Sequence, residues 1–169
     1  MKRSLVFLSL CCVLMVAFWS VNAAAPANFA GAWSLDKAKS EGLQGRMANV
    51  DQTWVVTQDA KTFTIDKSFS GGEQPMPSQK STYNLDGSET SQEMTGRMPG
   101  KAALKAKWQG DGKILELNSV LKAQMQGNDV TITTTEHWEL ADGGKTLKVH
   151  REQESPRGKQ ESKLTFVKK

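Results

Sequence analysis

The sequence predicts an all-β protein that folds as a single up-and-down antiparallel β-barrel of about 8–10 strands. Apolar and polar residues alternate with a period of two over most of the chain after residue 29. Asp-Gly and similar pairs separate the alternating runs, and such pairs are the strongest short-range signal for hairpins. Many twisted antiparallel strands tend to curl and close, which removes exposed edges. The alternative architecture is a sandwich of two sheets.

The alternating runs place ten candidate strands along the chain. Helical signals are weak, and residues 36–49 hold at most one short turn. The candidate strands span 29–35, 50–58, 61–69, 79–85, 88–95, 102–110, 113–125, 129–140, 145–154 and 159–167.

Tight turns between these strands would set apolar residues opposite apolar residues in five hairpins. A sixth hairpin, at Asp86-Gly87, would set Tyr83 opposite Thr90 and is the least informative. The short turns fall at one end of the sheet and the long connections at the other, so we expect a tight end and a loop-rich end. The expected pairs are Trp54 with Ile65, Trp108 with Leu115, Leu117 with Trp138, Trp138 with Leu147, and Val149 with Leu164.

Residues 1–23 have the parts of a secretory signal. Lys2 and Arg3 form its basic start, and an apolar run from residue 5 to 19 follows. Val21-Asn22-Ala23 fits the small-x-small rule for cleavage before Ala24. An uncleaved anchor is the alternative, but the run is shorter than the roughly 20 residues of a membrane span. We therefore expect an exported protein, periplasmic or extracellular, with no membrane span after cleavage.

The expected mature chain, residues 24–169, is long enough for one domain. Both cysteines lie in the signal, so the mature chain has no disulfide and no thiolate ligand or nucleophile. Removing Lys2 and Arg3 lowers the 22 basic residues to 20, against 18 acidic ones. These charges are scattered along the chain, so nucleic acid is not expected as a partner.

Several motifs resemble those of the lipocalins and the wider calycin group, and in particular small exported bacterial lipocalin-like proteins. A Gly-x-Trp lies in the stretch 29–36, and two Asp-Gly turns follow in Tyr83-x-Leu85-Asp86-Gly87 and Leu140-x-Asp142-Gly143-x-Lys145-Thr146-Leu147. The chain closes with a Lys-Leu-x-Phe-x-Lys tail at 163–168. The resemblance covers essentially the whole mature chain and implies a barrel that binds small molecules.

The resemblance also implies that Trp33 plugs the closed end of the barrel beneath an arginine from a late strand. Arg151 is the only late-strand arginine in inward phase, but it lies in mid-strand, so the usual lipocalin spacing is not met. By their positions near the tight turns, Trp108 and Trp138 join Trp33 as expected closed-end residues.

Polar residues in inward phase suggest a girdle that could hold the head group of a ligand. Arg151 or Lys67 would grip a carboxylate, with Gln52, Thr134 and Trp54 nearby. The alternative is a pair of Glu136 and Arg151 that satisfies itself and only sets the strand register. The expected neighbours across strands are Gln52 with Lys67, Ser119 with Glu136, and Thr134 with Arg151, and Glu136 and Arg151 are diagonal.

His137 and His150 share the outward face of adjacent strands without a convergent acidic cluster, so no metal site is expected. The sequence contains no Gly-x-Ser-x-Gly, no His-Glu-x-x-His and no glycine-rich phosphate loop after a strand. We therefore expect no catalytic residue, no cofactor and no enzyme activity.

Two functions remain as hypotheses. The first is an exported lipocalin-like protein that binds a small hydrophobic or amphipathic molecule inside the barrel. The alternative is an envelope or protein-interaction module with a filled core. A third, weaker hypothesis is an enzyme of the calycin type, which would need a second inward acid or base.

Overall fold

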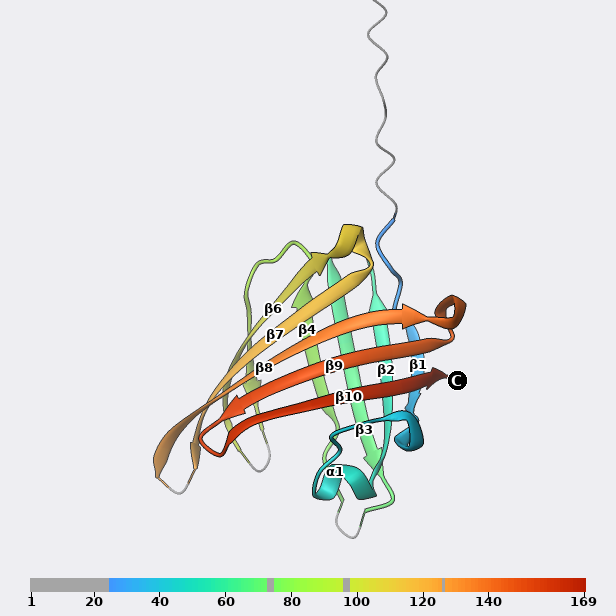
Figure 1. Ribbon diagram of the computed structural model, residues 1–169. Helices are drawn as coiled ribbons and strands as arrows, with labels where there is room; N and C mark the ends of the chain where they lie inside the picture. The colour runs from blue at the N-terminus through green and yellow to red at the C-terminus, as the bar shows by residue number, and fades with distance from the viewer. Residues whose placement is uncertain (1–24, 73–74, 96–97, 126) are drawn as a thin grey trace, which may run out of the picture.

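A computed structural model describes residues 25–72, 75–95, 98–125 and 127–169. The expected signal segment, residues 1–23, and its cleavage point before Ala24 lie outside the described residues. Ten antiparallel strands form one strongly curved, barrel-shaped sheet (Figure 1). The predicted fold class is confirmed, with ten strands rather than eight.

The strands follow the alternating runs of the sequence closely. Two short helices, η1 (Lys37–Lys39) and α1 (Arg46–Asn49), lie in the connection that follows the first strand. Among the described residues, no helix is both long enough and apolar enough to span a membrane. The strands are β1 (Gly31–Leu35), β2 (Asp51–Gln58), β3 (Thr62–Ser70), β4 (Gln79–Asn84), β5 (Thr90–Met94), β6 (Gly100–Gln109), β7 (Ile114–Met125), β8 (Asn128–Ala141), β9 (Thr146–Ser155) and β10 (Gly158–Lys168).

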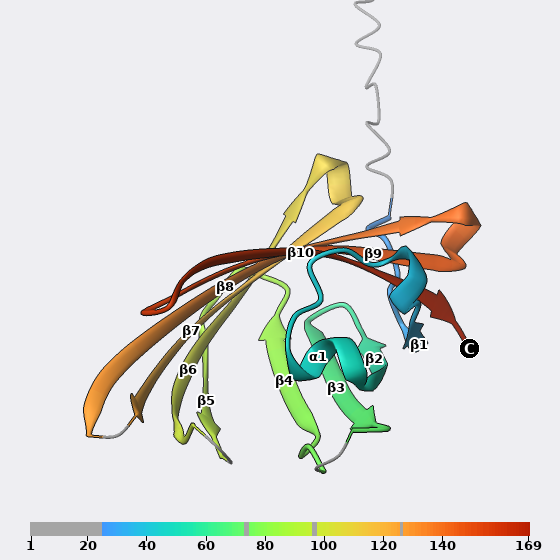
Figure 2. The same cartoon turned by 60° about the horizontal axis from the view of Figure 1, so that its bottom comes forward.

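The sheet has the order β4-β3-β2-β1-β10-β9-β8-β7-β6-β5, so the first and last strands are neighbours in its middle. Figure 2 shows how far the sheet bends: β5–β8 lie to one side, β2–β4 to the other, and β9 and β10 join them. β4 and β5 are therefore the two edges of the sheet.

The expected hairpin between β4 and β5 is wrong. Tyr83 does not pair with Thr90 in the sheet; the Thr90 hydroxyl instead donates to the carbonyl of Thr82 at 2.9 Å. The Gln92 amide donates in the same way to the carbonyl of Lys80. Side chains of β5 thus bind the backbone of β4 where a ladder of backbone hydrogen bonds was expected.

Two of the five informative registers are confirmed: Trp108 pairs with Leu115, and Val149 with Leu164. The other three differ by two residues. Trp54 pairs with Lys67 rather than Ile65, because Asp59 accepts hydrogen bonds from the amides of Lys61 and Thr62 and so builds a four-residue turn. The remaining two corrected pairs are Leu117 with Glu136 and Trp138 with Val149.

A shift of two residues keeps every side chain on its expected face, because successive side chains of a strand alternate between faces. It does, however, change which residues meet. Gln52 pairs with Phe69, Ser119 with Thr134, Thr134 with Gln153, and Glu136 directly with Arg151. The expected partners of the polar girdle are therefore corrected.

The core fills the half of the barrel next to the tight turns, and aromatic rings dominate it. Phe29 precedes β1 and is fully buried against Phe63, Trp108 and Trp138, with ring centroids 6.0–6.1 Å apart. The amide of Phe29 donates to the side chain of Gln58, which in turn donates to the carbonyl of Ala27. The segment before β1 is thereby held across the closed end.

Candidate ligand-binding site

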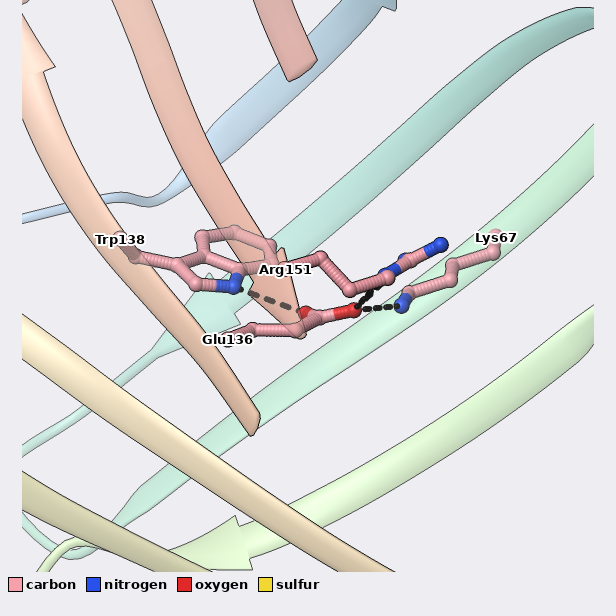
Figure 3. Close-up of polar contacts among 4 residues, drawn as sticks. All are labelled: Lys67, Glu136, Trp138 and Arg151. Atoms are coloured by element: carbon pink, nitrogen blue, oxygen red, sulfur yellow. Dashed lines mark hydrogen bonds and ion pairs between the residues drawn. The ribbon is translucent and has the colours of Figure 1, made fainter. Parts of the chain in front are cut away.

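The strongest group of interior polar residues is centred on Glu136 of β8. Arg151 lies directly opposite on β9, and its Nε and one terminal nitrogen donate to Glu136 Oε1 at 2.8 and 2.6 Å. Lys67 Nζ of β3 approaches the same oxygen at 3.3 Å. Trp138, two residues along β8, donates from Nε1 to Oε2 at 2.9 Å (Figure 3). We call Lys67, Glu136 and Arg151 the ion cluster.

The Glu136 carboxylate is deeply buried, with its side chain 6% exposed, whereas those of Lys67 and Arg151 are 17% and 22% exposed. Burial by itself would raise the pKa of Glu136. The attraction of Lys67 and Arg151, with the bonds from Trp138 and Arg151, outweighs burial and lowers that pKa to about 2. Glu136 therefore carries its negative charge at any physiological pH.

Two cations share this single carboxylate, so the ion cluster carries one net positive charge when all three groups are ionised. Burial lowers the pKa of Lys67, and the attraction of Glu136 opposes that shift. Tyr83 lies within electrostatic reach of the cluster, and burial holds the pKa of its phenol well above the ordinary value. The phenol thus stays neutral and adds no negative charge to the cluster.

Both cations also lie over the indole of Trp54. Lys67 Nζ is 4.3 Å and the Arg151 guanidinium carbon 5.8 Å from the ring centroid. Trp54 is fully buried, and among the described residues its Nε1 is the one buried side-chain nitrogen or oxygen without a hydrogen-bond partner. An unpaired buried N–H costs free energy. Trp54, whose ring lies beside Lys67, therefore has a hydrogen-bond donor without a partner.

Gln52 and Arg151 line one small cavity of about 90 Å³. Leu43 and Met47, from the connection between β1 and β2, line it as well. Thr134 is half-buried and lies one inward position further along β8 than Glu136, opposite Gln153. The expected girdle residues Arg151, Lys67, Glu136 and Trp54 thus come together, Gln52 borders them, and Thr134 lies beside them on the barrel wall.

The three expected closed-end tryptophans lie in the aromatic half. Trp33 and Trp138 are fully buried, and Trp108 is half-buried and stacked on Phe29. Trp33 Nε1 donates to the carbonyl of Phe29 at 2.8 Å. The cation over Trp33 is Lys168, with Nζ 5.3 Å from the ring centroid, and not an arginine.

His137 and His150 lie directly opposite one another on β8 and β9. His137 contacts Glu116 at 3.3 Å, and His150 contacts Glu161 at 2.8 Å. Across residues 25–72, 75–95, 98–125 and 127–169, no group of three or more His, Cys, Asp or Glu residues could hold a metal ion.

Sequence reasoning missed three features of this interior. Phe29 was expected in a strand, Lys168 was not considered as the cation over Trp33, and Lys67 was not placed on Glu136. The one local signal near Phe29 was the glycine at position 31, the first residue of β1, whose φ of 139° favours glycine. The contact of Lys67 with Glu136 joins residues 69 positions apart on strands that do not pair, so no local pattern indicated it.

Comparison with known proteins identifies the fold of this chain but does not assign it to a family. No protein-family model matches the chain, and no curated protein matches it either. Solved structures do match. Human cRBP IV is 20% identical with a TM-score of 0.54 and covers 85% of this chain and 100% of its own.

Two further structures agree with this match. Zebrafish ileal bile acid-binding protein, complexed with cholic acid, is 14% identical with a TM-score of 0.54, over 83% of this chain and 98% of its own. A SAHS protein from Ramazzottius varieornatus is 10% identical with a TM-score of 0.53, over 83% of this chain and 94% of its own. These neighbours are calycin-type barrels, and the fold implied by the sequence resemblance is confirmed.

Proposed function

We propose that this barrel binds a small hydrophobic or amphipathic molecule with an acidic group, whose acid is held by Lys67 and Arg151. The ion cluster carries the proposal, because two half-buried cations share one buried carboxylate. Burying a charge without its counter-ion is costly. An acid from a ligand would supply the missing negative charge and accept charge-assisted hydrogen bonds.

The surroundings of the cluster suit the body of such a molecule. The inward positions of β6 include Ala102 and Leu104, which are almost fully buried, and Leu121 of β7 packs partly against the core. Calycin-type barrels of the same fold include a bile acid-binding protein complexed with cholic acid, which supports a ligand of this kind. Export to the periplasm or the cell exterior and a non-enzymatic role complete the proposal.

One observation favours a second candidate function, a protein-interaction module with a filled core. Aromatic rings pack against one another in the closed half of the barrel, and Phe29, Phe63, Trp54 and Trp138 are fully buried there. The two candidates therefore differ in the use of the other half, where the ion cluster lies.

The first test is native mass spectrometry of the protein purified from its own host, followed by organic extraction. We expect an acidic amphiphile to co-purify in near-stoichiometric amount. A clean apo mass, together with no heat on titration with dodecanoate, would contradict ligand binding and favour the interaction module.

A pair of matched variants tests the role of the cluster. Arg151→Met should weaken dodecanoate binding about tenfold or more, because it removes a charge-assisted contact. Lys168→Met is the control, since Lys168 lies over Trp33 in the closed half and should leave binding unchanged. Both are measured by titration calorimetry. Equal affinities of Arg151→Met and the wild type would contradict the proposed anchor.

A further inference from the structure

The cavity of about 90 Å³ beside the ion cluster is lined by polar side chains from three strands. Gln52 comes from β2, Arg151 and Gln153 from β9, and Ser162 from β10. One water molecule takes up roughly 30 Å³ of liquid, and pockets for drug-sized ligands measure roughly 300–1,000 Å³. The cavity therefore has the size of a small polar group and not of the hydrocarbon body of a ligand.

Gln52 is unusual among these residues, because it is almost fully buried without a partner. Its exposed fraction is 3%. In the part of the chain that the structure describes, its amide forms no hydrogen bond. Unlike Nε1 of Trp54, which is completely enclosed, the amide keeps contact with the open space of the cavity. Buried amides need hydrogen-bond partners, and a molecule inside the cavity is the one that can supply them here.

Arg151 brings positive charge to the cavity. Its Nε and one terminal nitrogen donate to Glu136, and its other terminal nitrogen has no acceptor within the described residues. Glu136 does not line the cavity. Glu161 is the one acid among the described residues that does, and its carboxylate contacts His150 at 2.8 Å on the outer face. The cavity thus offers free N–H groups without a free carboxylate, which favours an anion.

The donors approach the cavity from several directions. Gln153 and Ser162 resemble Gln52 in that their side chains form no hydrogen bond across the described ranges of the chain. A carboxylate is planar and has two oxygen atoms, whereas a phosphate group on an ester has three strong acceptor oxygens. Donors on three strands match three diverging oxygen atoms better than two oxygen atoms in one plane.

The loop that borders the cavity is fixed to β10, so the cavity is pre-formed. Glu41 and Lys163 exchange two backbone hydrogen bonds of 2.8 and 3.0 Å. Gly42 follows with a φ of 72°, and a Cβ there would clash with the carbonyl oxygen of Glu161. A glycine at this position lets the loop approach the backbone of β10 closely. A pre-formed site loses less conformational freedom on binding.

We infer that this cavity binds a tetrahedral oxyanion, a phosphate or sulfate group, through Arg151 and Gln52 with Gln153 and Ser162. Two sources have this chemistry, the head group of an amphiphile and a free ion, and binding assays separate them. The inference deepens the proposed function, since Arg151 belongs to both the ion cluster and the cavity. It rests on that function for the hydrocarbon body of the ligand.

Two amphiphiles with the same chain length and different acids test the inference. We expect dodecyl phosphate to bind about tenfold or more tightly than dodecanoate in titration calorimetry, because its oxygen atoms accept from more donors. Inorganic phosphate is titrated alone. Its binding would show that a free ion is sufficient, whereas binding of dodecyl phosphate without it would identify the site as one for a head group.

Variants with a matched control connect the preference to the cavity. Gln52→Leu should weaken dodecyl phosphate binding about tenfold and leave dodecanoate binding unchanged. It should be at least as stable as the wild type in urea, because an apolar side chain replaces an unpaired amide. Ser162→Ala should act in the same direction by about threefold. Gln124→Leu is the control, since Gln124 is exposed on the outward face of β7 and bonds Asp129.

The outcomes separate this inference from the proposed function. If dodecanoate binds as tightly as dodecyl phosphate, the oxyanion cavity is wrong and the acid anchor stands. If inorganic phosphate binds and neither amphiphile does, the cavity stands and the proposed function is wrong. If no probe binds, both are wrong. If Gln52→Leu and Ser162→Ala keep the full preference for dodecyl phosphate, the assignment to this cavity is overturned.

Discussion

The closed half of the barrel and the ion cluster above it both lie inside the barrel, but they are built from opposite chemistry. The closed half holds aromatic rings in contact with one another, such as Trp54 and Trp138 with centroids 5.2 Å apart. In the cluster, the basic side chains of Lys67 and Arg151 both contact one oxygen atom of Glu136. Burial of apolar surface stabilises a fold without any partner, whereas a buried ion cluster gives little net stability.

This difference teaches that stability and the proposed binding belong to separate halves of one sheet. Trp54 and Trp138 form the boundary, since each contacts the aromatic core with one part of its ring and the ion cluster with another. Substitutions in the closed half should act on unfolding, and substitutions in the cluster should act on charge and binding.

The largest expected effect on stability comes from removing a ring from the aromatic half. Phe29→Ala should lower the free energy of unfolding by about 3–5 kcal/mol, the usual cost of removing a buried aromatic ring. The ring contacts Phe63, Trp108 and Trp138, so a cavity would remain among them. Urea denaturation measures the change. Val167→Ala on the outer face is the control and should cost less than about 0.5 kcal/mol.

A smaller effect is expected from removing the charge at the centre of the cluster. Glu136→Gln should cost about 3 kcal/mol at neutral pH, because it leaves the half-buried Lys67 and Arg151 without their counter-ion. An acidic ligand should recover part of this loss. An unchanged stability would mean that Glu136 does not hold the two cations.

The lowered pKa of Glu136 predicts how the stability of the protein depends on pH. Glu136 has a folded pKa of about 2 against an ordinary value of 4.5, so the folded state holds the charged form more strongly. Its contribution to stability is complete above pH 4.5 and is lost as the pH falls from 4.5 to about 2. The difference between wild type and Glu136→Gln should therefore shrink across that window in urea titrations.

The smallest effect is expected on the outer face, which belongs to neither half of the interior. Replacing His137 and His150 together by Ala should change the free energy of unfolding by less than about 1 kcal/mol, because partly exposed ion pairs contribute little. Dodecanoate binding should stay the same in calorimetry. A large loss of binding would show that the outer face communicates with the cluster.

The sequence predicted the fold class and the face of each strand residue well. Alternation with a period of two placed Glu136, Arg151, Lys67 and Trp54 in the interior, and the structure shows all four at the cluster. Two registers were also predicted correctly, among them the pairing of Trp108 with Leu115.

Three registers and the β4–β5 hairpin were not predicted correctly. A shift of two residues preserves the face of every side chain, so the apolar pattern cannot distinguish between neighbouring even registers. The turns decide instead, through contacts such as those of Asp59 with the amides of Lys61 and Thr62. The shift at the β8–β9 turn brings Glu136 directly opposite Arg151.

The sequence by itself thus determined which side chains face inward, because side-chain direction is a local property of a strand. Only the tertiary structure decided that Lys67 and Arg151 share one carboxylate, because β3 and β8 lie far apart in the order of the sheet and meet through its curvature. The contact of two cationic side chains with a single carboxylate follows from that curvature, and so does the separation of a stabilising half from a charged one.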